Sequence, residues 1–162
     1  MIVVGYQGIG KSSLAGRDNK YIDLESGNFW VDGKRSEDWY KIYCQIAEHL
    51  SQQGYIVFTS SHEVVRKQLA NSTEIVVVVY PSIHLKDIWL KKLRDRYVNT
   101  GLEKDYKALM NAEARYEENI RELANCDITY KLSLQNPDYD LEASLIHFRN
   151  RDLATDTTGW TA

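Results

Sequence analysis

The sequence predicts an α/β fold of three layers, in which a five-stranded parallel sheet lies between helices. Short runs rich in β-branched and aromatic residues alternate with longer segments of helical periodicity. Two of these runs, 3–6 and 75–80, are almost continuously apolar, which is typical of parallel strands covered on both faces. The chain has 162 residues, enough for one well-filled core, so we expect a single domain at residues 1–150.

The elements follow one another in the order β-α-β-α-β-α-β-α-α-β-α. The strands are expected at 3–6, 21–24, 55–59, 75–80 and 128–132. Apolar positions with helical spacing define three helix faces: Trp39, Tyr43, Ile46, Ala47 and Leu50; then Leu85, Trp89, Leu93 and Tyr97; then Tyr106, Leu109, Met110, Tyr116, Ile120 and Leu123. Residues 151–162 are polar and read as a weakly ordered tail, in which only Trp160 suggests docking.

Composition narrows the class of protein. The formal net charge is −3 and the pI is near 5.8, whereas a general nucleic-acid binder normally has a basic excess. Cys44 and Cys126 have no metal or redox spacing and are expected to be reduced thiols. No apolar run reaches the length of a membrane span, and no signal segment precedes the first strand. We therefore expect a cytoplasmic monomer or homodimer that acts on a small molecule, away from membranes.

A phosphate-binding motif follows the first strand directly. It reads Gly5-Tyr6-Gln7-Gly8-Ile9-Gly10-Lys11-Ser12, a complete G-x-x-x-x-G-K-S loop between a strand and a helix. Backbone N–H groups of such a loop surround the β-phosphate, the lysine reaches the β- and γ-phosphates, and the serine hydroxyl binds Mg²⁺. The motif predicts that ATP and Mg²⁺ are bound by Gly5, Gly8, Ile9, Gly10, Lys11, Ser12 and Ser13.

Acidic residues follow the second strand. Asp23 and Glu25 lie two apart in an extended segment and so face the same side, where one can join the Mg²⁺ shell and the other position an acceptor. A solvated strand end is the alternative. The third strand has no acidic residue before Glu63, which shifts the metal-binding role to Ser12 and Asp23.

Polar residues also follow the third strand. Ser60 and Ser61 either cap the next helix or contact substrate, and His62 is expected at the surface rather than as a base. Arg66, one turn further, suits an acceptor phosphate because a guanidinium binds phosphate oxygens in pairs. Upstream, Arg35 lies among Phe29, Trp30, Trp39 and Tyr40, where a base can stack.

Two arginines precede a polar break between long helices. Arg94 and Arg96 come just before the break at 98–101, and arginines on a segment that closes over nucleotide can neutralise the transferring phosphoryl group. A solvated basic face is the alternative. Arg115 on the next helix either contacts phosphate or forms an ion pair within the helix.

With these residues placed, the chain resembles the small P-loop kinases, a group that includes nucleoside monophosphate kinases and shikimate kinase, and it is similar in size to small nucleotide kinases of bacteriophages. The resemblance covers residues 1–150 by element order and is specific at Gly5 to Ser12. It implies a sheet order of 2-3-1-4-5, a substrate lobe near 26–53, a lid near 94–115 and adenine contacts around 135–137. The chain lacks the Asp-Gly-Phe-Pro-Arg string of adenylate kinases, and the lid is too short for a zinc site.

The expected function is ATP- and Mg²⁺-dependent phosphoryl transfer to a small acceptor, a (deoxy)nucleoside monophosphate. Lys11, Asp23, Arg94 and Arg96 are the expected catalytic residues, Ser12 and Asp23 the metal ligands, and Glu25, Arg35, Ser60 and Arg66 the acceptor-binding residues. Two alternatives remain open at this point: a kinase of small-molecule or polynucleotide 5′-hydroxyls, and a nucleotide-dependent switch without turnover.

Overall fold

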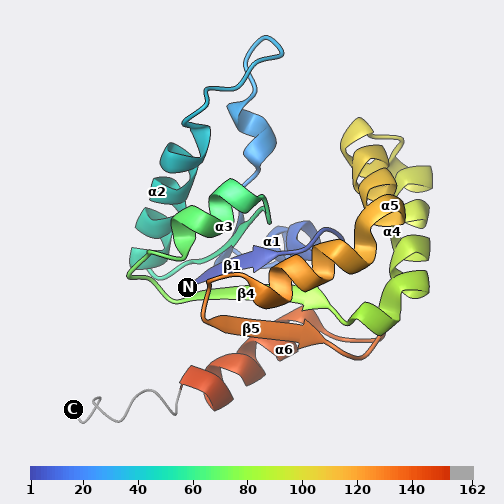
Figure 1. Cartoon of the computed structure of the whole chain (residues 1–162). Coiled ribbons are helices and arrows are strands. Elements are labelled where there is room, and N and C mark those ends of the chain that lie inside the picture. Colours follow the sequence, from blue (N-terminus) through green and yellow to red (C-terminus); the bar gives the residue numbers. More distant parts are fainter. Residues whose placement is uncertain (154–162) are drawn as a thin grey trace.

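The computed structural model describes residues 1–153 (Figure 1). The strands are β1 (Ile2–Gly5), β2 (Tyr21–Asp23), β3 (Ile56–Thr59), β4 (Val76–Pro81) and β5 (Tyr130–Leu134). The α-helices are α1 (Lys11–Arg17), α2 (Trp39–Gln52), α3 (Glu63–Leu69), α4 (Lys86–Thr100), α5 (Glu103–Asn125) and α6 (Leu141–Phe148). Short helical turns lie at η1 (Ser26–Phe29), η2 (Ile83–Leu85) and η3 (Arg149–Leu153). The predicted order of elements is confirmed.

The five strands form one parallel sheet in the order β2-β3-β1-β4-β5, as predicted. The central strand β1 is buried along its whole length, and Val3 pairs with Phe58 on one side and Val77 on the other. Right-handed crossovers place α1 and α6 on one face of the sheet and α2, α3 and α5 on the other (Figure 1). Because all strands are parallel, their carboxyl ends meet at one edge, and the loops that follow them lie together there.

Several predicted boundaries need correction. β5 begins at Tyr130 rather than at residue 128, because its ladder with β4 starts where Tyr130 pairs with Val77. α4 continues through Thr100, so the break predicted at 98–101 reduces to a tight connection in which Gly101 has a φ of +62°.

The predicted buried face of α5 also needs correction at its N-terminal end. Tyr106 and Met110 are 45% and 37% exposed. Leu109 and Tyr116 are buried as predicted, and Asp105, Ala108 and Ala112 complete the buried face there in place of Tyr106 and Met110, on the side where α5 packs against α4.

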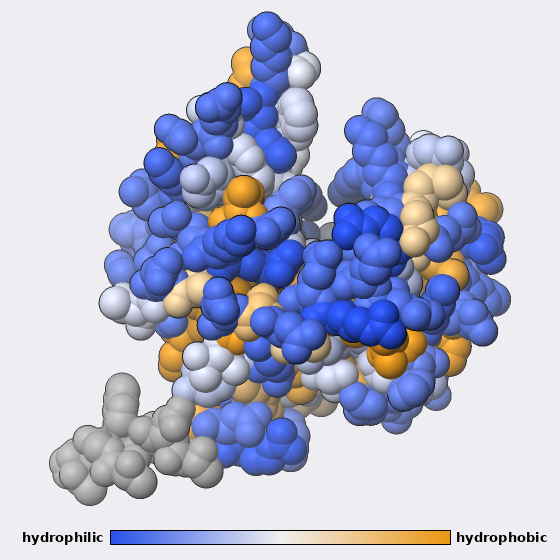
Figure 2. All heavy atoms as spheres, viewed as in Figure 1, coloured by the Kyte–Doolittle hydropathy of each residue, from blue (hydrophilic) through white to orange (hydrophobic). Residues whose placement is uncertain are grey.

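Two projections flank the carboxyl edge of the sheet. On one side is the segment 26–38 with the start of α2, and on the other is the antiparallel hairpin of α4 and α5 (Figure 1). Figure 2 shows a hollow between them whose visible walls are mostly hydrophilic. α5 bends at Arg115, whose φ of −138° and ψ of 21° are not helical. The loop between β1 and α1 leaves the sheet at this same carboxyl edge, between the two projections.

Within residues 1–153, none of the helices combines the length and apolar character needed to cross a membrane. Of the predicted tail, 151–153 belong to η3. The rest of it, including Trp160, lies outside the described residues.

Candidate functional site

The loop between β1 and α1 has the backbone shape that the glycine motif predicts. Gly8 and Gly10 have φ values of +87° and +106°, in the region that favours glycine. A Cβ on Gly5 would lie 2.6 Å from Ile9 Cδ1 and 2.9 Å from Lys11 Cδ, so this position also requires glycine. The loop thus curls tightly over the end of β1, with Lys11 and Ser12 opening α1.

Lys11 is folded under the loop rather than exposed to solvent. Its Nζ donates to the carbonyls of Gly5 at 3.0 Å and Thr59 at 3.4 Å. Burial lowers the pKa of Lys11, while the carboxylates of Asp23 and Glu25 act in the opposite direction. Lys11 takes this position because the carboxyl ends of β1 and β3 offer two carbonyls within reach of its stem.

Ser12 and Asp23 meet, as predicted. The Ser12 hydroxyl donates to Asp23 Oδ2 at 2.9 Å, so both oxygens lie at one point beside the glycine loop. Glu25 pairs with Lys104 of α5 at 3.8 Å. In the described part of the chain, no group of three or more His, Cys, Asp and Glu side chains converges as a ligand set. Two oxygens beside a phosphate loop nevertheless fit Mg²⁺, which takes its other ligands from phosphates and water.

Two cavities open on the loop and meet over it. The first has a volume of about 420 Å³ and lies between the end of β3, α3 and α5. The second has a volume of about 380 Å³ and lies between the end of β2, α1 and the α4–α5 connection. Gln7, Lys11 and Ser60 line both. The two cavities therefore adjoin at these three residues, beside Lys11.

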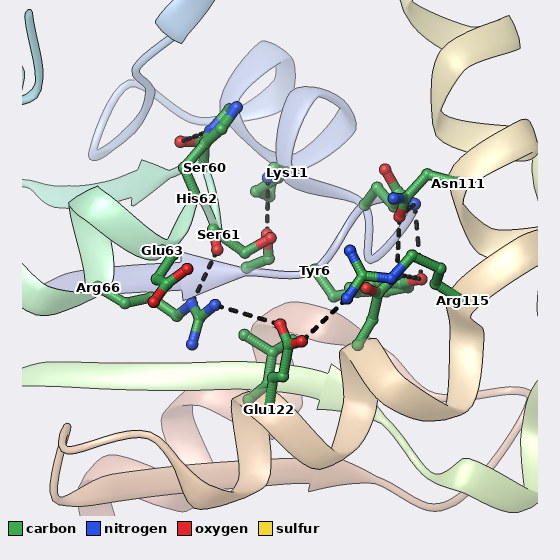
Figure 3. Close-up of a pocket in the computed structure, with 14 residues that line it drawn as sticks. Tyr6, Lys11, Ser60, Ser61, His62, Glu63, Arg66, Asn111, Arg115 and Glu122 are labelled. Atoms are coloured by element: carbon green, nitrogen blue, oxygen red, sulfur yellow. Dashed lines mark hydrogen bonds and ion pairs between the residues drawn. The ribbon is translucent and has the colours of Figure 1, made fainter. Parts of the chain in front are cut away.

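The first cavity has a cationic wall (Figure 3). Arg66 is anchored by its Nε, which donates to the Ser61 carbonyl at 2.9 Å, and its side chain is only 11% exposed. Glu122 lies between two arginines, 3.7 Å from Arg66 and 3.1 Å from Arg115. Both guanidinium groups line the cavity and share one carboxylate. Arg115 also pairs with Glu118 at 3.0 Å, so the predicted ion pair within the helix is present, while its contact to phosphate stays a prediction.

The second cavity contains Arg96 but not Arg94. Arg96 Nε lies 2.9 Å from Oδ1 of Asp105, a carboxylate that is 4% exposed and also accepts from the Thr100 hydroxyl. Arg94 instead pairs with Glu113 at 3.2 Å and lines neither cavity. Residues two apart on a helix point in different directions, which separates the predicted pair.

Of the remaining predicted site residues, some line the cavities and others do not. Ser60 lines both cavities, and its Oγ forms a hydrogen bond of 2.8 Å with His62 Nδ1. Among residues 1–153, no side chain caps the N-terminus of α3. Desolvation, followed by Arg35 and Lys11, lowers the pKa of His62, which favours a neutral imidazole. Arg35 lies 3.8 Å from the Trp39 ring centre, outside the residues that line these cavities. Neither Ser13 nor the segment 135–137 lines them either.

A polar stripe on α5, which was not predicted from the sequence, lines the first cavity. Asn111, Asn119 and Glu122 line the first cavity together with Arg115. Asn119 Nδ2 donates to Asn111 Oδ1 at 2.7 Å. The spacing of these four residues, by four, four and three, is the signal that identifies one helix face, and it lies beside the buried apolar face of the same helix.

Comparison with known proteins does not assign the chain to a family. The chain matches no protein-family model, and a search of curated proteins found no match. The site is therefore defined by its own geometry: a glycine loop at the start of α1, two adjacent oxygens on Ser12 and Asp23, and two adjoining cavities of which one has paired arginines.

Proposed function

We propose that this protein is an ATP- and Mg²⁺-dependent kinase that transfers the γ-phosphoryl group to a nucleoside monophosphate. The observation that supports it most is the pair of cavities that meet beside Lys11. A kinase must bring two phosphate-containing molecules together end to end, and the proposal assigns one to each cavity.

In this proposal the glycine loop and the second cavity bind the donor. The N–H groups from Gly8 to Ser12 surround the β-phosphate, and Lys11 leaves the two carbonyls to reach the β- and γ-oxygens. Ser12 and Asp23 would hold Mg²⁺, which would supply neutralisation of the polyphosphate charge. Arg96 lies across the same cavity, where it can contact the γ-phosphoryl group.

The first cavity is proposed to bind the acceptor. Arg66 and Arg115 bind its phosphate in place of the Glu122 carboxylate that they share in the free protein. The asparagines of α5 and Gln7 offer amide groups to the rest of the acceptor. An acceptor phosphate oxygen then attacks the γ-phosphorus while the bond to the β-phosphate oxygen breaks, giving ADP and a nucleoside diphosphate.

The charges of the first cavity favour a monophosphate over a hydroxyl acceptor. A hydroxyl must lose a proton to a base, whereas a monophosphate is largely ionised near neutral pH. The two carboxylates that line this cavity are both paired: Glu63 with Lys67 at 2.9 Å and Glu122 with its arginines. His62 faces the same cavity, so the hydroxyl kinase remains the second candidate, with this imidazole as its base.

The test is a screen of nucleoside monophosphates, nucleosides and sugar acids with ATP and Mg²⁺, followed by detection of ADP and the phosphorylated product. Lys11→Met should abolish turnover, and Lys107→Met is the matched control because that lysine is an exposed partner of Glu103 outside both cavities. Turnover with nucleosides but not with monophosphates would favour the hydroxyl kinase. ATP binding without turnover of any acceptor would favour the switch.

A further inference from the structure

Two aromatic side chains hold the outer side of the glycine loop. Trp89 Nε1 donates to the Gln7 carbonyl at 2.9 Å, and the Tyr139 hydroxyl donates to the Ile9 carbonyl at 2.7 Å. Trp89 belongs to α4, and Tyr139 to the segment between β5 and α6. Neither residue belongs to the motif, and neither lines the two cavities.

These two bonds act on the peptide groups that matter for anion binding. A trans peptide is planar, with its C=O and N–H pointing in opposite directions. The Gln7 carbonyl shares a peptide with the Gly8 N–H, and the Ile9 carbonyl shares one with the Gly10 N–H. Fixing both carbonyls toward the outside therefore aims both N–H groups toward the inside of the loop, where a phosphate is expected.

The two aromatic rings are themselves fixed. They stack with centres 5.9 Å apart and an angle of 19° between their planes, and Trp89 is only 1% exposed. Lys92 Nζ lies 2.9 Å from the Tyr139 hydroxyl and 4.5 Å from the Trp89 ring centre. An ammonium group can only donate, so the phenol accepts from Lys92 and its single proton remains for the Ile9 carbonyl.

The lack of a side chain at Gly8 lets the Trp89 indole lie close against the loop. A Cβ on Gly8 would lie 3.2 Å from Trp89 Nε1 and 3.0 Å from Leu93 Cδ2. Glycine at this position is therefore required twice, once for its positive φ and once for the close approach of α4.

We propose that Trp89, Tyr139 and Lys92 are positioning residues that pre-orient the Gly8 and Gly10 amides for polyphosphate before it binds. The inference rests on the proposed function, since it assumes that the loop binds phosphate. Without these bonds the loop peptides are free to rotate, and ordering them on binding lowers affinity.

The test compares two variants, each of which replaces a tyrosine by phenylalanine and so removes one hydrogen-bonded hydroxyl. Tyr139→Phe removes the bond to the loop. Tyr116→Phe removes an equally short bond, of 2.7 Å to the Ser82 carbonyl, away from the loop, and is the matched control. The probes are pyrophosphate with Mg²⁺, which senses the loop without any adenine contact, and ADP with Mg²⁺, both measured by calorimetry. The amide resonances of Gly8 and Gly10 provide a second readout.

Tyr139→Phe should weaken pyrophosphate and ADP binding by about 3- to 10-fold, the factor expected for one net hydrogen bond, and should shift both glycine amides in the free protein. Tyr116→Phe should lower the melting temperature to a similar extent and change neither affinity. Lys92→Met, which keeps the stem and loses the ammonium, should show a smaller loss than Tyr139→Phe.

Equal affinities for wild type and Tyr139→Phe would overturn the positioning role while leaving the proposed function intact. Equal losses in the two phenylalanine variants would also overturn it, because the effect would then be one of stability. A wild-type protein that binds neither pyrophosphate nor ADP would refute the proposed function together with this inference.

Discussion

Replacing Glu122 by glutamine should tighten acceptor binding, which is opposite to the usual effect of a substitution in a binding site. In the free protein the Glu122 carboxylate forms ion pairs with both Arg66 and Arg115, at N–O distances of 3.7 and 3.1 Å. An acceptor phosphate must displace that carboxylate before it can reach either guanidinium. Glutamine has the same shape and keeps a carbonyl acceptor, but it lacks the charge that competes with phosphate.

The expected change in the acceptor KM is estimated from the solvent exposure of the paired side chains. Glu122 is 50% exposed, whereas Arg66 is 11% exposed, so the ion pair that joins them is half screened by solvent. Half-exposed pairs contribute a few tenths to about 1 kcal/mol, which corresponds to a factor of about 2 to 5 in the KM of the acceptor. The effect should shrink at high salt, because added ions already weaken the competing pair.

The assay is the acceptor KM of the best monophosphate from the screen, at saturating ATP, for wild type and Glu122→Gln. Glu117→Gln is the matched control: it removes a carboxylate from the same helix whose partners, Lys86 and Arg121, lie outside the cavities. A higher KM in Glu122→Gln than in wild type would refute the reasoning, since Glu122 would then orient the arginines for the acceptor instead of competing with it.

Three further predictions concern the donor side. Burial lowers the pKa of Lys11 in the free protein and bound phosphate should raise it, so polyphosphate binding should take up protons and weaken as the pH rises through the free-state pKa, and calorimetry at alkaline pH in buffers of different ionisation enthalpy should detect this uptake, which Lys11→Met should lose. Arg96→Lys should lower kcat more than it weakens ATP binding, whereas Arg94→Lys should change neither; equal effects in steady-state kinetics would contradict the separation of the two residues. Asp23→Asn should cost a moderate factor in kcat for a monophosphate acceptor; a loss of about 10²–10⁴-fold with a vanished limb of the pH–rate profile would indicate a hydroxyl acceptor whose base is Asp23 rather than His62.

The parts of the fold that were predictable are those encoded by short contiguous patterns. The glycine loop and its neighbouring strand needed only adjacent residues, and the apolar runs located all five strands to within two residues. The boundary of β5 was less accurate because Ile128 is buried without joining the ladder. Sheet order came from the resemblance and is confirmed, since local patterns do not determine which strands pair.

The candidate site was predictable where it depends on the loop and less so where it depends on helix orientation. Ser12 and Asp23 meet as expected because Ser12 lies in the first turn of α1 and Asp23 ends β2, both at the carboxyl edge of the sheet. Arg94 and Arg96 were grouped by adjacency, although a turn of 100° per residue already places them far apart around α4. The polar stripe of α5 was overlooked because most of the helix surface outside its buried face is polar. Only the packing of α5 determines which polar residues face the cavity.

The α4–α5 hairpin contacts every part of the candidate site. Trp89 holds the back of the glycine loop, Arg96 lines the second cavity, and Arg115 lines the first. The hairpin has one irregular point, the non-helical backbone of Arg115, and the residues after it pack on the sheet while those before it pack on α4. An anion bound by this guanidinium therefore acts at the bend itself, so acceptor binding and the position of Arg96 are expected to depend on the same backbone. If the proposed function holds, the acceptor and the donor-side arginine are linked through the α4–α5 hairpin as well as through the γ-phosphoryl group that passes between the two ligands.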